Sequence, residues 1–291
     1  MKTIRAVIDS LRLKQWTKNL LIFAGILFSQ NIFVLPMLIN VLSAFAIFCL
    51  LSGAVYLFND IGDIERDRKH PLKSLRPLAS GRLSIREAFI AFTVIVVTGL
   101  GASFYLGPYF FAVALGYVLL QIAYTFFLKY VVILDVFAIA AGFVLRVIAG
   151  AVVIDVDISS WLIICTILLS LFLGFSKRRH ELESLDQSAR EHRKVLGDYS
   201  VYLLDQMISV VTASTVVCYA LYTMSDETVS KFGTTKLIFT VPFVLYGIFR
   251  YLYLVHKKGE GGNPENILVK DIPLIIDIFL WAATAAFILY V

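Results

Sequence analysis

Residues 58–81 read FNDIGDIERDRKHPLKSLRPLASG, a dense charged segment in an otherwise apolar chain. Asparagine and aspartate residues come first, and lysine and arginine residues follow them. The segment comes directly after an apolar run, 37–58, so the charges gather where a hydrophobic helix is expected to end. A charge cluster in this position suggests a functional site at a helix end.

The composition of the whole chain gives the setting for this segment. Of the 291 residues, 59% are hydrophobic and only 16% are charged, and the mean hydropathy is +0.83. Soluble domains carry roughly 25% charged residues. The apolar runs do not alternate with polar residues as the strands of a membrane β-barrel do. The sequence therefore predicts an all-α integral membrane protein.

Apolar runs predict about nine membrane-spanning helices, because each run can cross a hydrocarbon core of about 30 Å. We expect residues 1–291 to form a single transmembrane domain, in which the charged loops 59–86 and 177–199 cap a functional site. The predicted spans are 17–35, 37–58, 87–106, 108–128, 131–153, 159–176, 200–223, 236–256 and 272–291.

The distribution of positive charge predicts the orientation. Nearly all of the 26 Lys and Arg fall in segments that would share one side of the membrane, and the other side keeps only Lys231 and Lys236. Because positive residues concentrate in cytoplasmic loops, we expect a cytoplasmic N-terminus and an inner or plasma membrane location.

The acidic part of the opening segment has a helical period. If the helix over 37–58 continues, one stripe contains Ser52, Tyr56, Asn59, Asp63 and Asp67, and Asp60 lies one residue off it. Two carboxylates one turn apart, with a carboxamide before them, suit Mg²⁺, which binds one or two carboxylates together with substrate phosphates. The alternative is a solvated helix end with Asp–Arg pairs.

The basic part is punctuated by Pro71, Pro77 and Gly81, which favour a fixed course for the loop. Lys73 and Arg76 would then form a clamp for a diphosphate beside the metal. The alternative is that this loop collects cations as any cytoplasmic loop does.

Polar residues inside or at the ends of apolar runs are further candidates, because ionisable groups are unfavourable in a bilayer and mark functional sites. Asp135 and Arg146 share a face of the predicted span 131–153 but are too far apart to pair directly. Anchoring at the membrane surface is the alternative for the cations at span ends. The candidates are Lys18, Tyr124, Lys129, Asp135, Arg146, Lys177, Arg178 and Arg179.

The segment NDIGDIERD, Asn59 to Asp67, resembles the NDxxDxxxD motif of the UbiA superfamily of intramembrane transferases. Members of that superfamily have nine helices and bind an isoprenoid diphosphate through magnesium on two Asp-rich loops. The second loop of this chain has no DxxxD and begins SKRRHELE instead. In this respect, and in DRKHPLKSLRPLASG and RLKQWTKNLL, the chain resembles the branch that makes polyprenyl-phosphoryl 5-phosphoribose.

The resemblance implies transfer of 5-phosphoribosyl from 5-phosphoribosyl diphosphate to a polyprenyl phosphate such as decaprenyl phosphate, in the synthesis of the cell-wall arabinose donor. Mg²⁺ would be held by Asn59, Asp63 and Asp67 with Asp60 nearby, and Lys73 and Arg76 would complete the site. The remaining candidates would line the cavity or hold the second phosphate.

Two other functions are open at this point. One is prenyl transfer to an aromatic or quinone precursor, and the other is transport of phosphorylated lipids or sugars. The lipid bilayer is an expected partner and nucleic acid is not, and homo-oligomerisation is open.

Overall fold

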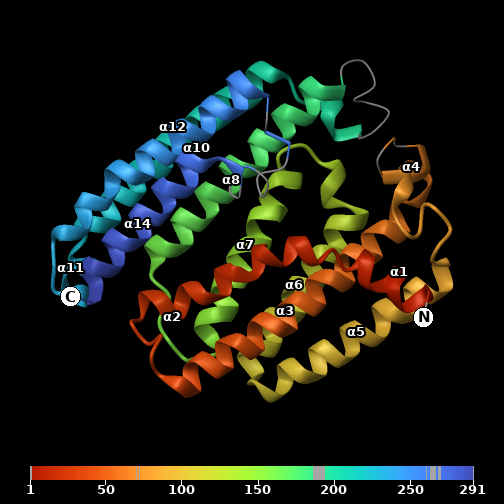
Figure 1. Cartoon of the computed structure of the whole chain (residues 1–291), viewed down its shortest axis with the longest axis horizontal. Coiled ribbons are helices and arrows are strands. Elements are labelled where there is room, and N and C mark those ends of the chain that lie inside the picture. Colours follow the sequence, from red (N-terminus) through yellow and green to blue (C-terminus); the bar gives the residue numbers. More distant parts are fainter. Residues whose placement is uncertain are drawn as a thin grey trace. The chain divides into compact units, whose positions relative to one another are not determined.

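The computed structural model describes residues 2–69, 71, 73–185, 194–259, 261–262, 267 and 270–290. Within these ranges the chain is helical and contains no strand. The chain divides into two compact units, Met1–Ile158 and Ser159–Val291 (Figure 1). That residues 1–291 act as one domain stays a prediction, and the part of the predicted loop 177–199 that covers 186–193 lies outside the described residues.

Unit 1 contains four long helices, together with short α and 3₁₀ helices at its ends and turns. In chain order they are α1 (Lys2–Ser10), η1 (Leu13–Phe23), α2 (Ala24–Phe28), α3 (Leu35–Gly62), α4 (Ile64–Lys69), η2 (Lys73–Leu75), α5 (Ile85–Tyr105), α6 (Pro108–Phe126), η3 (Leu128–Tyr130) and α7 (Leu134–Val152).

Unit 2 is built in the same manner from long apolar helices. Its elements are α8 (Ser160–Leu185), η5 (Lys194–Asp198), α10 (Val201–Met224), α11 (Asp226–Phe232), η6 (Lys236–Thr240), α12 (Val241–Lys258) and α14 (Ile272–Tyr290). Arg250 of α12 donates two hydrogen bonds to the carboxylate of Asp271, at 3.0 and 2.8 Å, just before α14. These hydrogen bonds from Arg250 lower the pKa of Asp271 and tie the two helices together.

Eight helices in the described part of the chain are long and apolar enough to cross a membrane, and they correspond to the last eight predicted spans. The all-α membrane fold is therefore confirmed. The helix α8 differs from its prediction, because it continues to Leu185 instead of ending at 176. Lys177, Arg178 and Arg179 thus lie inside a helix rather than at its end.

The first predicted span, 17–35, does not form one long helix. Its residues belong to the 3₁₀ helix η1, the short α2 and the turn after it. This segment lies directly against α7, where a Cβ at Gly150 would come within 2.7 Å of the carbonyl carbon of Ile22 and a Cβ at Gly25 within 3.0 Å of the backbone of Ala151. The ninth span and the cytoplasmic N-terminus stay predictions.

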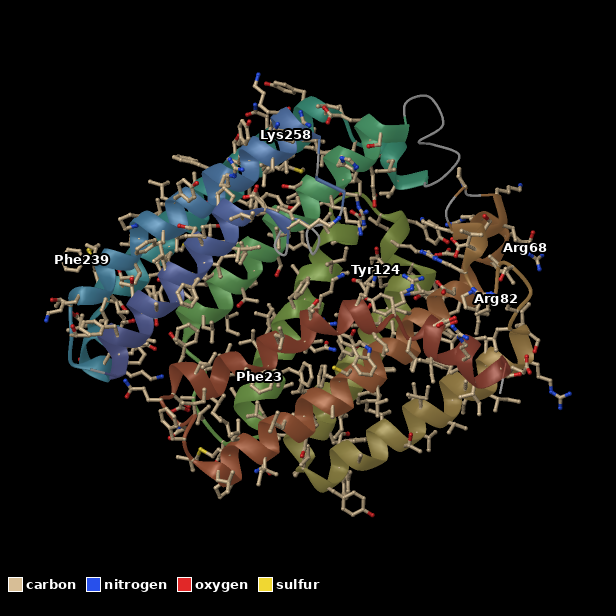
Figure 2. The ribbon with its side chains drawn as sticks, in the orientation of Figure 1. Phe23, Arg68, Arg82, Tyr124, Phe239 and Lys258 are labelled. Atoms are coloured by element: carbon tan, nitrogen blue, oxygen red, sulfur yellow. The ribbon has the colours of Figure 1, made fainter. Side chains whose placement is uncertain are left out.

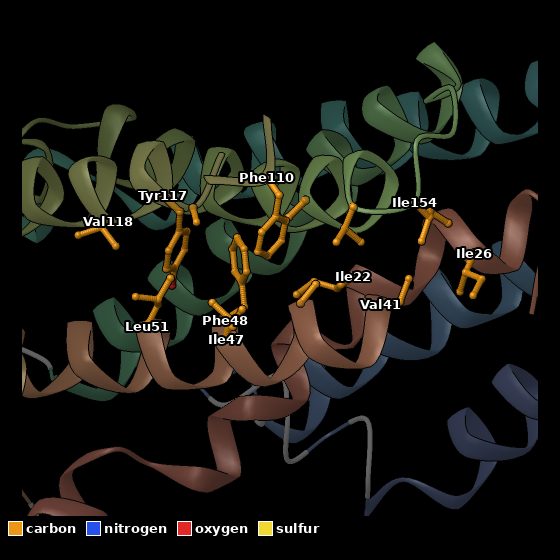
Figure 3. Close-up of a cluster of buried hydrophobic side chains, with 14 of the residues drawn as sticks. Ile22, Ile26, Val41, Ile47, Phe48, Leu51, Phe110, Tyr117, Val118 and Ile154 are labelled. Atoms are coloured by element: carbon orange, nitrogen blue, oxygen red, sulfur yellow. The ribbon is translucent and has the colours of Figure 1, made fainter. Parts of the chain in front are cut away.

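The core of unit 1 joins this segment to the long helices around it (Figure 3). Phe48 of α3 packs against Phe110 and Tyr117 of α6, with ring centroids 5.9 and 5.3 Å apart. Ile22 of η1 is fully buried in the same cluster. The burial of these large side chains fixes η1, α3, α6 and α7 relative to one another, and these elements carry the polar clusters described below.

Candidate functional site

The acidic segment is divided by a break in the helix. α3 ends at Gly62, α4 begins at Ile64, and Asp63 between them has φ −108° and ψ 8°, in the bridge region where many active-site residues lie. Asn59 and Asp60 are therefore on the last turn of α3, whereas Asp67 is on α4. The predicted stripe is confirmed from Ser52 to Asn59 and is interrupted after it.

We define the acidic cluster as Asn59, Asp60, Asp63 and Asp67 together with three of the cations that pair with these carboxylates, Arg12, Arg76 and Lys129; a fourth cation, Arg66, lies 3.5 Å from Asp63. Arg76 donates to Asp60 at 3.1 Å and to Asp67 at 2.5 Å. Arg12 donates to the same oxygen of Asp60, although the two residues are 48 positions apart. Figure 2 shows the charged end of unit 1 on which Arg68 and Arg82 are labelled.

Asn59 and Asp63 of the acidic cluster connect the end of α3 to the end of α6. Lys129 in η3 donates to Asp63 at 2.9 Å, and Thr125 donates to the amide oxygen of Asn59. Lys129 is itself buried. The contacts of Lys129 with Asp63 and of Thr125 with Asn59 are separate from the ion pairs around Arg76, in which Arg12, Asp60, Arg76 and Asp67 form one connected network.

The burial of its carboxylates distinguishes this network from an ordinary solvated helix end. Asp60 is 2% exposed and Asp67 is 4% exposed. The alternative of a solvated helix end is therefore wrong for both carboxylates, although the Asp–Arg pairs of that alternative are present, since Arg76 binds both. Burying a charged group is unfavourable unless it is paired, so the paired cations are required for this arrangement.

The chemistry of the acidic cluster fits magnesium. Mg²⁺ prefers oxygen ligands, and Asn59 and the three aspartates offer only oxygen. In the described part of the chain, no three carboxylate, imidazole or thiolate groups converge on one point. Each carboxylate is bound by a cation instead. A bound Mg²⁺ would therefore take over at least one carboxylate that Arg12, Arg76 or Lys129 holds here.

A second polar cluster surrounds Arg146 in α7, and we call it the deep cluster. Arg146 is 5% exposed, and it donates to Asn19 at 2.7 Å, to Tyr117 at 2.9 Å and to the carbonyl oxygen of Gly142 at 2.7 Å. Its guanidinium also lies over the ring of Tyr117, 4.8 Å from the centroid. Among the described residues, all hydrogen-bond partners of this buried cation are neutral.

The deep cluster and the acidic cluster are joined along α3. Asn19 donates to Ser52 at 3.1 Å, and Arg12 lies over the ring of Tyr56, 5.0 Å from the centroid. Ser52 and Asp60 are eight residues apart, which corresponds to about 12 Å of helix rise. One face of α3 therefore carries both clusters, with the deep cluster farther from the helix end.

Sequence reasoning missed Arg12, Asn19 and Tyr117. Tyr117 could have been found, because Tyr117, Gln121 and Tyr124 are spaced by four and three residues and share a helix face. Asn19 and Arg12 gave no such signal, since each reaches its partners only after the N-terminal segment has packed against α3 and α7.

The remaining predicted residues of unit 1 are placed as follows. Lys18 is half-buried beside Asn19 and interacts electrostatically with Tyr117. Tyr124 is half-buried near the end of α6, and Lys73 is exposed in η2. Asp135 is fully buried in the first turn of α7.

Lys177, Arg178 and Arg179 belong to unit 2, and carboxylates bind the two arginines. Arg178 donates to Glu181 at 2.6 Å, and it is 2% exposed. Arg179 donates to Glu183 at 2.5 Å and to Asp205 of α10 at 2.6 Å. A phosphate at either arginine would have to compete with these carboxylates, which the cationic run in the sequence did not reveal.

Comparison with known proteins adds a family relation. The model of the UbiA prenyltransferase family matches residues 19–266. The decaprenyl-phosphate phosphoribosyltransferase of Mycolicibacterium smegmatis is 31% identical over 99% of this chain and 93% of its own. The enzyme of that name from Mycobacterium tuberculosis is 32% identical over 97% of this chain and 93% of its own.

The fold is also similar to that of solved structures. A UbiA homologue from Archaeoglobus fulgidus, bound to GPP and Mg²⁺, has a TM-score of 0.72 and covers 98% of this chain and 100% of its own. Its sequence identity is 18%, so this similarity concerns the fold alone.

Proposed function

Because the chain belongs to the UbiA prenyltransferase family, we propose that it is a transferase that moves 5-phosphoribosyl from 5-phosphoribosyl diphosphate to a polyprenyl phosphate. The observation that carries the proposal is the similarity, over nearly the whole chain, to two decaprenyl-phosphate phosphoribosyltransferases. The two cation-containing clusters of unit 1 support it, because both substrates are anionic phosphates.

In the proposed reaction, an oxygen of the lipid phosphate attacks C1 of the ribose. The bond between C1 and the diphosphate oxygen breaks, and the diphosphate leaves with the electron pair. The attacking phosphate is already an anion, so no side chain has to remove a proton from it. Positioning of the two substrates and stabilisation of the leaving charge should therefore supply most of the rate.

The acidic cluster is the proposed site for the donor diphosphate. Asn59, Asp63 and Asp67 would hold Mg²⁺, which supplies stabilisation of negative charge on the diphosphate. Arg76 lies within hydrogen-bonding distance of Asp60 and Asp67, and its guanidinium can bind phosphate oxygens through two parallel hydrogen bonds. Lys73 on the same loop would add a second cation.

The deep cluster is the proposed site for the phosphate of the lipid acceptor. Arg146 is a buried cation in a membrane-spanning helix, and its partners among the described residues are neutral. A phosphate group would supply the missing negative charge, and the polyprenyl tail could leave sideways into the bilayer. Lys18 and Tyr124 are the other proposed contacts of the acceptor phosphate.

Three further assignments, two of residues and one of location, are also proposals. Lys177, Arg178 and Arg179 are proposed to bind a second phosphate group of a substrate, which would have to displace the carboxylates that bind the two arginines. Asp135 and Lys129 would line the site. The protein is a multi-pass membrane protein, and we propose that it lies in the inner or plasma membrane with the site open to the cytoplasm.

The function is tested with the purified full-length protein, Mg²⁺, a polyprenyl phosphate and 5-phosphoribosyl diphosphate labelled in the ribose. We expect the label to enter the lipid phase while diphosphate is released in equal amount. Transfer of a prenyl group from a prenyl diphosphate to an aromatic acceptor, without ribose transfer, would assign the chain to the other branch of the family. Absence of diphosphate release with both donors would indicate a transporter.

Replacing Arg146 with Lys is expected to weaken the use of the lipid acceptor. Lysine keeps the positive charge but loses the planar fork that binds Asn19 and Tyr117. Loss of one or two hydrogen bonds to a charged group should raise KM for the polyprenyl phosphate about 10- to 100-fold. Steady-state kinetics with each substrate varied in turn provide the measurement.

The matched control for this substitution is Arg86→Lys, which changes an exposed arginine in the first turn of α5. It should leave both KM values unchanged. If Arg146→Lys raised KM for the donor and left that for the lipid at its wild-type value, the assignment of the deep cluster to the acceptor would be wrong.

A further inference from the structure

Arg12 lies between α1 and η1 in an uncommon backbone conformation. Its φ is 51° and its ψ is 60°, in the left-handed region that residues other than glycine rarely adopt. Residues in such conformations persist when their surroundings hold them, and they concentrate at functional sites. The conformation alone assigns no role, so the contacts of the side chain decide.

The side chain of Arg12 reaches the centre of the acidic cluster. One Nη donates to Oδ1 of Asp60, the same oxygen that receives a hydrogen bond from Arg76 at 3.1 Å. The guanidinium also lies over the ring of Tyr56. Among the described residues, the other nitrogen atoms of Arg12 donate no hydrogen bond, and 28% of its side chain is exposed. Arg12 therefore has hydrogen-bond donors left for another ligand.

A hollow of about 420 Å³ opens beside this side chain. It is lined by Ile8, Asp9, Arg12, Leu13, Lys14 and Gln15. Two of the lining residues, Arg12 and Lys14, are cations. Arg82 donates a hydrogen bond to the carboxylate of Asp9 at 3.4 Å. The free donors of Arg12 are therefore next to an opening from the surface and on the same guanidinium that binds Asp60 of the acidic cluster.

Gly53 of α3 allows the residue before Arg12, Leu11, to pack closely against this helix. A Cβ at this position would lie 3.1 Å from the Cβ of Leu11 and 3.3 Å from its carbonyl oxygen. A side chain larger than hydrogen would therefore push the junction between α1 and η1 away from α3. Since Asp60 follows on the same helix, that shift would lengthen the distance from Arg12 to the acidic cluster.

From these contacts we propose that Arg12 is a further substrate-binding residue, which exchanges its hydrogen bond to Asp60 for phosphate oxygens of the donor diphosphate. This inference rests on the proposed donor site at the acidic cluster. Arg12 and Arg76 share one carboxylate oxygen without substrate, and a diphosphate offers each of them oxygens of its own. The charge of the Mg²⁺ that Asn59, Asp63 and Asp67 would hold nearby would then compensate the buried carboxylate of Asp60.

The test uses the purified full-length protein and two substitutions, Arg12→Ala and Arg12→Lys. Binding of inorganic diphosphate in the presence of Mg²⁺ is measured by calorimetry, and KM is measured for the donor and for the polyprenyl phosphate. We expect Arg12→Ala to weaken diphosphate binding and to raise the donor KM about 10- to 100-fold, with KM for the lipid changed less than about twofold. Arg12→Lys should lie between Ala and the wild type.

Arg5→Ala is the matched control, because it removes an exposed arginine from α1. It should behave as the wild type does. Gly53→Ala is the second variant, which leaves Arg12 in place but displaces its segment, and it should also raise the donor KM. If Arg12→Ala does not fold, Arg12→Lys decides the matter, since it keeps the positive charge beside Asp60.

Wild-type diphosphate binding by Arg12→Ala, or by Arg12→Lys if only that variant folds, would overturn the inference. Equal losses for donor and lipid would overturn it as well, because they would indicate a structural role. Binding of inorganic diphosphate does not depend on the organic group of the donor. The result for Arg12 can therefore be separated from a failure of ribose transfer by the wild-type protein.

Discussion

Asp67→Asn is expected to reduce turnover about 10²- to 10³-fold, which is the usual loss when one group that stabilises transition-state charge is removed. The substitution keeps the shape of the side chain but removes the negative charge that Arg76 and the proposed Mg²⁺ require. Asparagine is used instead of alanine because Asp67 is buried. Turnover is measured by diphosphate release over a range of Mg²⁺ concentrations.

The control for Asp67→Asn is Glu65→Gln on the same short helix. The Glu65 side chain is 77% exposed and pairs only with Arg68 in the described structure, so it should have wild-type turnover. The thermal midpoint of Asp67→Asn should stay within about 3 °C of the wild type, because Arg76 keeps its bond to Asp60. Near-wild-type turnover of a folded Asp67→Asn protein would contradict the metal site.

Gly150→Ala is expected to lower the stability of the fold more than Gly53→Ala or Gly101→Ala does. The added Cβ would overlap the backbone of Ile22, and a backbone cannot rotate away as a flexible side chain can. Overpacking generally costs about 1–3 kcal/mol. We expect at least the upper end of this range, and a thermal midpoint lower by about 5 °C or more in detergent.

The same substitution should also reduce activity, because it moves η1 and with it Asn19, which binds Arg146. Gly101→Ala is the control, since a Cβ at that position of α5 would meet no atom within 4 Å. It should leave stability unchanged or raise it slightly, because alanine favours a helix more than glycine does. If Gly150→Ala were as stable as Gly101→Ala, η1 would be able to move away from α7 without a loss of stability, and the prediction would be wrong.

The sequence predicted the features that depend on local pattern. The apolar runs located the eight long helices, and the spacing of Ser52, Tyr56 and Asn59 placed them on one face of α3. Arg76, which the sequence predicted as part of a diphosphate clamp, lies beside the acidic residues and binds Asp60 and Asp67, and the clamp itself stays a prediction. Each of these features follows from residues close together in the chain.

The features that the sequence did not reveal depend on contacts between distant segments. The run 17–35 has the hydropathy of a span, but its course is decided by the close approach of Ile22 and Gly25 to α7. The pairing of Arg12 with Asp60 joins residues 48 positions apart. Arg178 and Arg179 were expected to be free for phosphate, and the carboxylates that bind them come partly from another helix, α10.

The break at Asp63 has a consequence for how such a site could evolve. Asp60 lies on α3 and Asp67 lies on α4, so the backbone angles of the residues between them set the distance between their carboxylates. A substitution at Gly62 can alter this separation without replacing any ligand. Substitutions at neighbouring residues that bind no ligand can therefore change the affinity for a metal or for a diphosphate in small steps. The NDxxDxxxD pattern itself stays constant.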